Sequence, residues 1–76
     1  MKVHLGGHLS LYAPERRANF EVRLAGPAAV RELVALWGIP AGEVFLATVS
    51  HVVVDLDTAV VADGDLLSLY PPAGGG

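Results

Sequence analysis

The residues best suited to chemistry are the last six, Pro71-Pro72-Ala73-Gly74-Gly75-Gly76. Each proline ring fixes φ near the polyproline value, so the chain should leave its last element stiff and extended. The three glycines carry no side chain that would obstruct a narrow site, and each residue adds about 3.3–3.6 Å of reach. We therefore predict that the carboxylate of Gly76 is the reacting group. Pro72, Gly74 and Gly75 would then line its approach to a partner, unless this end is merely solvated and inert.

Histidine and aspartate side chains are the other groups that could carry chemistry. The three histidines lack the spacing of a metal site, so we expect surface histidines and no bound metal. Two pairs of aspartates could suggest acid–base catalysis, but turn chemistry explains them better. The sequence contains no cysteine, which excludes a thiolate zinc site, a disulfide scaffold and an internal thiol catalyst. The residues concerned are His4, His8 and His51, Asp55 with Asp57, and Asp63 with Asp65.

Length and composition predict one small folded domain. The chain has 76 residues, of which 53% are hydrophobic. This length suits a single domain, and this apolar fraction favours a compact core over disorder. No stretch approaches the roughly 18 apolar residues of a membrane span, and Met1-Lys2-Val3-His4 lacks the apolar core of a signal peptide. We therefore predict a soluble, cytoplasmic protein with no membrane partner.

Charge is divided unevenly along the sequence. Residues 1–31 contain all five cations and two acids, a net charge of +3, whereas residues 32–76 contain six acids and no cation. An acidic half beside an extended tail would be repelled by nucleic acid and attracted to a basic protein surface. The sequence also has no basic stripe with interleaved aromatic residues, which nucleic-acid binding favours. We expect a protein partner and no nucleic acid.

Two strands are predicted in the N-terminal part. Alternation over residues 2–12 predicts one long strand, interrupted by a bulge at Gly6-Gly7. Residues 17–24 alternate more regularly, with Phe20 on the apolar face, and predict a second strand antiparallel to the first.

A single amphipathic helix follows these strands. Pro27 suits the first turn of a helix, and Gly38 is placed to end it before Ile39-Pro40. Trp37 is expected in the core as its largest side chain. The apolar stripe, at the spacing i, i+3, i+4 and i+7, consists of Val30, Leu33, Val34 and Trp37.

Three further strands are predicted in the C-terminal half. Residues 44–49 are almost all apolar, as in a central strand covered on both faces, and residues 52–54 form a shorter strand. Between them Ser50-His51 lacks the glycine that favours tight hairpins, so we predict a loose turn. The last strand, residues 66–70, leads directly into the prolines.

The elements together predict an α+β roll over residues 1–70 and a flexible tail over residues 71–76. About five strands would form one mixed sheet, and the single helix would cover one of its faces. The opposite face must then be solvated or bound by a partner. The candidate members of an apolar docking patch on it are Leu46, Val53 and either Leu67 or Leu69.

Three C-terminal segments carry a resemblance to a known family. Residues 52–58 read Val-Val-Val-Asp-Leu-Asp-Thr, residues 62–66 contain an Asp-Gly-Asp turn, and residues 70–76 combine Pro-Pro with terminal glycines. This stretch resembles the closing part of the MoaD/ThiS sulfur carriers of the ubiquitin-like β-grasp superfamily. Residues 30–33 are similar to the start of that family's helix. The resemblance implies a β-grasp fold.

The resemblance also implies that the chain is a carrier and not an enzyme. In this family a partner enzyme uses ATP to adenylate the terminal glycine, and sulfur then replaces one oxygen to give a thiocarboxylate. The implied partners are that adenylating enzyme and a sulfur-accepting synthase subunit or biosynthetic enzyme, with no cofactor bound to the carrier itself. The Pro-Pro exit is most similar to the small subunit of molybdopterin synthase, which implies molybdenum cofactor biosynthesis.

Two segments depart from the family pattern and leave alternatives open. Ser50-His51 stands where members often carry Asn-Gly, and Gly6-Gly7 with the connection over residues 13–17 differs from the common molybdopterin-synthase subunit. A tungsten-cofactor, specialised sulfur-donor or protein-tagging role is therefore equally open. The alternative functions are a ubiquitin-like modifier conjugated through Gly76 and an interaction module with an inert tail.

Overall fold

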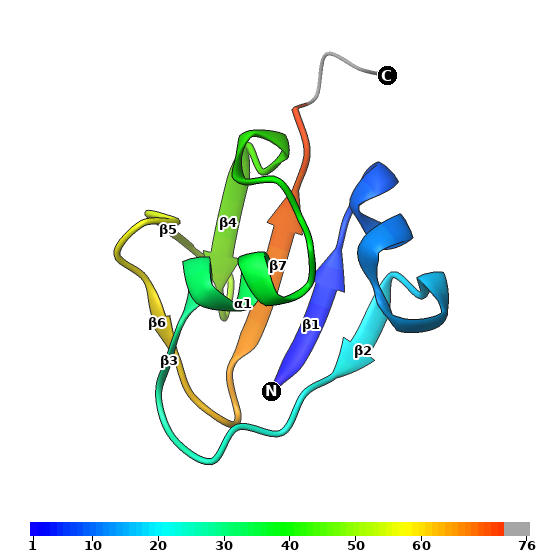
Figure 1. The fold of residues 1–76 in the computed structure, drawn as a ribbon. Coiled ribbons are helices and arrows are strands. Elements are labelled where there is room, and N and C mark those ends of the chain that lie inside the picture. Colours follow the sequence, from blue (N-terminus) through cyan, green and yellow to red (C-terminus); the bar gives the residue numbers. More distant parts are fainter. Residues whose placement is uncertain (73–76) are drawn as a thin grey trace.

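The fold is a five-stranded mixed sheet with one helix across one face (Figure 1). The computed structural model describes residues 1–72. In the sheet order β2-β1-β7-β4-β5, only the β1–β7 pair is parallel. This arrangement confirms the predicted α+β class and is consistent with a β-grasp. The strands are β1 (Lys2–Leu5), β2 (Asn19–Glu21), β4 (Leu46–Val49), β5 (Val52–Val54) and β7 (Leu66–Tyr70).

Helix α1 (Val30–Leu36) covers the sheet with the stripe that the spacing predicts. Its Val30, Leu33 and Val34 side chains are buried, and Trp37 is half-buried with its ring 5.5 Å from that of Phe20. The helix begins later than Pro27 because residues 28–29 are extended. Gly38 ends it as predicted, with φ of +75° and its N–H bonded to the Ala35 carbonyl.

The core lies between α1 and the sheet. Val3 and Leu5 of β1 and Leu67 and Leu69 of β7 are at most 1% exposed, and all four point toward the helix side. Each buried apolar side chain of this size contributes about 1.5–3 kcal/mol to folding. The middle of the sheet therefore supplies the best-covered part of the core.

The predicted long first strand is wrong beyond residue 5. β1 ends at Leu5, and Gly7–Tyr12 forms a 3₁₀ helix, η1, in place of a continued strand. Gly7 has φ of +52°, which turns the chain out of the sheet. Leu9 is fully buried while Leu11 is 62% exposed, so the apparent alternation does not define a sheet face. A second 3₁₀ helix, η2 (Pro14–Arg16), connects to β2.

A small second sheet was not predicted. β3 (Ala28–Ala29) pairs antiparallel with β6 (Val60–Val61), and this pairing brings the start of α1 beside the segment that follows β5. The predicted strand over residues 17–24 is shorter in the structure: β2 is Asn19–Glu21 and pairs with β1 in the expected antiparallel direction. Backbone bonds between Met1 and Val22 extend this pairing by one residue. Residues 22–24 instead lead to the helix across the lower end of the sheet in Figure 1.

The aspartate-rich turns form as predicted, with their carboxylates bonded to backbone groups. Asp55 accepts from the N–H of Asp57 at 2.8 Å, and Asp65 accepts from the N–H of Ala62 at the same distance. Asp63 accepts from the N–H of Leu24 at 3.1 Å and from the Met1 ammonium at 3.0 Å. Both interactions, of which the bond from Leu24 has the larger effect, hold the pKa of Asp63 below its usual range.

Within residues 1–72, no helix has the length and apolar character needed to cross a membrane.

The turn between β4 and β5 is tighter than predicted. Ser50 and His51 have φ of 48° and 71°, and Val49 pairs with Val52 directly across the turn. The left-handed backbone is unfavourable for these two side chains, but neighbouring contacts compensate. The N–H of Ser50 donates to the Leu66 carbonyl at 2.7 Å, which attaches the turn to the start of β7.

We predict that His51→Gly stabilises the protein by about 0.5–1 kcal/mol, because relief of left-handed strain exceeds the entropy that glycine adds to the unfolded chain. The free energy of unfolding in urea measures this. Val53→Gly, within β5, is the control and should destabilise the protein. A His51→Gly variant that is less stable than the wild type would contradict this account of the turn.

Candidate functional site at the end of strand β7

The end of β7 is held on both sides by backbone hydrogen bonds. On the β1 side, the N–H of Gly6 donates to the Leu69 carbonyl at 2.8 Å. On the β4 side, the N–H of Phe45 donates to the Tyr70 carbonyl, also at 2.8 Å. Tyr70 is therefore the last residue of β7 that is fixed within the sheet.

Two prolines follow this fixed residue. Because proline has no N–H, neither Pro71 nor Pro72 can continue the hydrogen-bonded ladder. Pro71 is half-buried and Pro72 is exposed. The chain leaves the sheet between η1 and the 3₁₀ helix η3 (Ala41–Glu43), as Figure 1 shows. The predicted reactive residue Gly76, with Gly74 and Gly75, lies outside the described residues.

The prediction that Leu67 or Leu69 contributes to a docking patch is wrong. Both side chains are fully buried beneath α1, because β7 pairs with β1 in the register Val3 with Leu67 and Leu5 with Leu69. A shift of one residue in the pairing register would move every side chain of the strand to the opposite face of the sheet. The sequence of β7 alone, with leucine at both parities, could not distinguish these faces.

The face of the sheet opposite α1, here called the open face, is mixed in character. Its middle row is polar: His4, Ser68 and Thr48 are register neighbours, and His4 Nδ1 lies 2.9 Å from Asn19 Oδ1. Val53 ends this row and is 64% exposed. The open face thus lacks a continuous apolar patch. Its members are Asn19, Glu21, Lys2, His4, Leu66, Ser68, Tyr70, Leu46, Thr48 and Val53.

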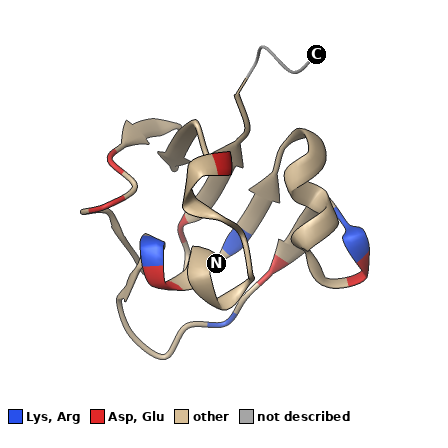
Figure 2. Ribbon diagram, turned by 45° about the horizontal axis from the view of Figure 1, so that its top comes forward, with Lys and Arg blue, Asp and Glu red and all other residues tan. Residues whose placement is uncertain are grey.

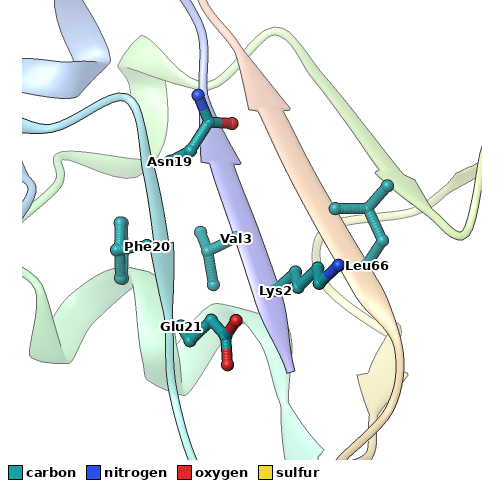
Figure 3. A pocket seen from close by; sticks show the side chains of 6 residues that line it. All are labelled: Lys2, Val3, Asn19, Phe20, Glu21 and Leu66. Carbon is teal, nitrogen blue, oxygen red and sulfur yellow. The ribbon is translucent and has the colours of Figure 1, made fainter.

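A shallow hollow lies over β1, β2 and β7 (Figure 3). Its volume is about 220 Å³. Pockets for small molecules usually measure roughly 300–1,000 Å³, so this hollow offers little enclosure for a ligand. Its lining residues are Lys2, Val3, Asn19, Phe20, Glu21 and Leu66.

A cluster of polar side chains joins η1 to η3 beside the end of β7. Glu43 of η3 lies 2.8 Å from His8 Nε2 through one carboxylate oxygen and accepts from the Tyr12 hydroxyl at 2.7 Å through the other. The hydrogen bond from Tyr12, followed by that from His8, holds the pKa of Glu43 below its usual range. The same bond to Glu43 raises the pKa of Tyr12. Sequence reasoning missed this cluster because Glu43 is more than 30 residues away from both His8 and Tyr12 in the sequence.

The histidines are distributed over separate parts of the molecule. His4 is on the open face, where its ring lies 5.8 Å from that of Tyr70, His8 contacts Glu43, and His51 is in the β4–β5 turn. Among residues 1–72, no three His, Asp or Glu side chains gather closely enough to hold a metal ion.

Acidic residues follow the β5 edge of the sheet, whereas cations and acids are mixed near the β2 edge (Figure 2). Arg16 and Arg17 belong to η2 and the segment that leads into β2, whereas Asp55 and Asp57 follow β5. β2 and β5 are the two edge strands, and Glu15 lies 4.0 Å from Arg17 near the β2 edge, so this edge is less strongly charged than the sequence halves suggest. A charged partner would therefore meet the two edges differently.

No protein-family model matches the chain, and no curated protein matches it. We therefore argue its function from the residues of the tail and from the geometry at the end of β7.

We predict that Leu67→Ala lowers the free energy of unfolding by about 2–5 kcal/mol, because it leaves a cavity under α1. Leu36→Ala is the matched control, since Leu36 is 78% exposed, and its effect should stay within about 0.5 kcal/mol. Denaturant titration followed by circular dichroism measures both variants. Equal losses in the two variants would contradict the placement of Leu67 in the core.

Glu43 should make stability depend on pH in the acidic range. Its pKa is lowered in the folded state, so its stabilising contribution is present above its unfolded pKa and is lost as pH falls through its folded pKa. We predict that Glu43→Gln is less stable than the wild type at pH 7 and that the difference shrinks below about pH 4. Urea titrations across pH measure this, with Glu32→Gln as control. A difference that does not change with pH would contradict the prediction.

Proposed function

We propose that the chain is a sulfur carrier whose Gly76 carboxylate is activated by a partner enzyme and converted to a thiocarboxylate. The observation that carries the proposal is the transition at the end of β7: backbone bonds fix the chain through Tyr70, and two prolines then direct it away from the sheet. The glycine-rich sequence that follows has no side chain to hinder entry into a partner's site. The resemblance of this stretch to MoaD/ThiS carriers supports the same function.

The proposed chemistry follows from the poor reactivity of a carboxylate. An oxygen of the Gly76 carboxylate attacks the α-phosphate of ATP, and pyrophosphate leaves as the acyl adenylate forms. The outer sulfur of a donor persulfide attacks the activated carbonyl carbon, and the bond to AMP breaks to give an acyl disulfide. A thiol then reduces the S–S bond, which releases the donor sulfur in a disulfide with that thiol and leaves the thiocarboxylate on the carrier. The donor and the reducing thiol belong to the partners. The carrier supplies a stable body and an unobstructed terminus.

The chemical work in this proposal belongs to partner proteins. An adenylating enzyme would supply the ATP site, and a synthase subunit or biosynthetic enzyme, in the cytoplasm, would accept the sulfur. The uneven charge supports a protein surface as the partner, because Asp55 and Asp57 would favour a basic surface at the β5 edge. Molybdenum cofactor biosynthesis is the pathway that the Pro-Pro exit favours.

A modifier function would use the same activated terminus differently. The amine of a lysine on another protein would attack the acyl adenylate or a derived thioester, giving an isopeptide bond. The chain contains one lysine, Lys2, and would therefore be a poor acceptor for building chains of itself. Sulfur replacement and isopeptide formation give different products, so one reaction mixture distinguishes them.

We predict that the 76-residue chain, incubated with its adenylating enzyme, ATP and a sulfur donor, gains the mass expected when one oxygen is replaced by sulfur. Intact-mass spectrometry measures the product. Variants that lack Gly76 or carry one extra residue after it should give no product while keeping the wild-type circular dichroism spectrum, because the change is confined to the tail.

Two results would contradict the proposal. One is an unchanged mass of this chain when the same enzyme preparation adenylates a second carrier that serves as the positive control. The other is equal product from the variant without Gly76. Conjugates to lysine amines, in place of the sulfur product, would favour the modifier function.

A further inference from the structure

We infer that Gly6 and Gly7 are positioning residues that set the direction in which the tail leaves the sheet. This inference rests on the proposed function, because a defined direction matters when the terminus must enter a partner's site. The two glycines lie where β1 gives way to η1, beside the end of β7. Gly6 lies close to Tyr70, and Gly7 lies close to Pro71.

Gly6 makes room for the ring of Tyr70. A Cβ atom placed on Gly6 would lie 2.8 Å from Tyr70 Cδ1, a separation that would force one of the two groups to move. The backbone of Gly6 is extended, with φ of −78° and ψ of 156°, so glycine is not required here by its conformation. The close approach of the Tyr70 ring is the reason that the position favours glycine. That ring also lies 5.8 Å from the His4 ring, centre to centre.

Gly7 makes room for Pro71 and also needs a left-handed backbone. A Cβ atom on Gly7 would lie 2.9 Å from Pro71 Cγ and 3.5 Å from Pro71 Cδ. Its φ of +52° would strain any other residue. The Pro71 ring therefore packs against the backbone of Gly7. A methyl group on residue 7 would push the proline ring away from η1.

The surrounding contacts make this arrangement rigid enough to set a direction. The bond from the Gly6 N–H to the Leu69 carbonyl fixes β1 against β7 next to the contact. Glu43 of η3 also holds η1 through its contacts with His8 and Tyr12. Proline has a fixed φ, so a shift of Pro71 would also change the direction in which Pro72 continues the chain. We therefore expect a displacement of Pro71 to alter how the tail is presented to a partner.

Three alanine variants separate close contact from backbone strain. Gly6→Ala adds the contact without positive φ, and Gly7→Ala adds both contact and strain. Gly38→Ala is the matched control: its φ is +75°, and a Cβ there would meet nothing within 4 Å.

Two measurements are made on the full chain of each variant. The first is independent of function: NMR records the Pro71 ring resonances and their cross-relaxation with residue 7. The second is the rate of thiocarboxylate formation with the adenylating enzyme. Circular dichroism and thermal unfolding show whether each variant is folded under the conditions used.

We expect Gly6→Ala and Gly7→Ala to shift the resonances of Tyr70 and Pro71 and to lower the rate roughly ten- to a hundredfold, the loss typical of an ångström-scale misplacement. Gly38→Ala should lose stability and keep both the resonances and the rate.

Unmoved Pro71 resonances in folded Gly7→Ala would overturn the inference, as would a rate equal to that of Gly38→Ala. If the wild-type chain forms no thiocarboxylate, the proposed function fails. The NMR comparison still decides then whether the two glycines place the tail. Failure of the function and failure of this inference are thus distinguishable.

Discussion

The central position of β7 is the constraint on which the rest of the structure depends. β7 pairs in parallel with β1 and antiparallel with β4, and its Leu67 and Leu69 are fully buried under α1. A shift of one residue would bring Leu66 and Ser68 to the helix side in their place. Burial thus fixes the register of β7, and the register fixes Tyr70 as its last residue. The place at which the tail leaves the body is therefore determined by the core.

The direction in which the chain leaves the sheet depends on the register of β7 and also on local contacts at the end of this strand. Backbone bonds from Gly6 and Phe45 end at Leu69 and Tyr70, and Pro71 then lies against Gly7. Glu43 links the 3₁₀ helices on either side through its bonds to His8 and Tyr12. The segments near the exit thus serve one geometrical purpose, although they are distant in sequence. A body of this kind suits a protein whose reactive group lies on a tail and whose partners supply the chemistry.

The sequence predicted the features that depend on local signals. The helical stripe, the cap at Gly38, the aspartate turns and the last strand all follow from periodicity or turn chemistry within a few residues. The features it did not predict depend on pairing between distant segments. Leucine occurs at both parities of β7, so its buried face was set only by pairing with β1. Gly6-Gly7 interrupts an alternating pattern and therefore suggested a bulge. The sequence cannot show the actual reason for these glycines, which is that Tyr70 and Pro71 lie against them. The Ser50-His51 turn is tight because β7 supports it, which turn propensity alone cannot reveal.

The central claim is that the Gly76 carboxylate is the group on which the partner enzyme acts. Exchange of radioactive pyrophosphate into ATP tests it most directly, because exchange requires reversible adenylation of that carboxylate. A chain carrying a C-terminal amide has the same folded body but no carboxylate oxygen to adenylate. We expect exchange with the natural chain and none above background with the amide. Equal exchange with both chains would contradict the claim, since the enzyme would then be activating some other group.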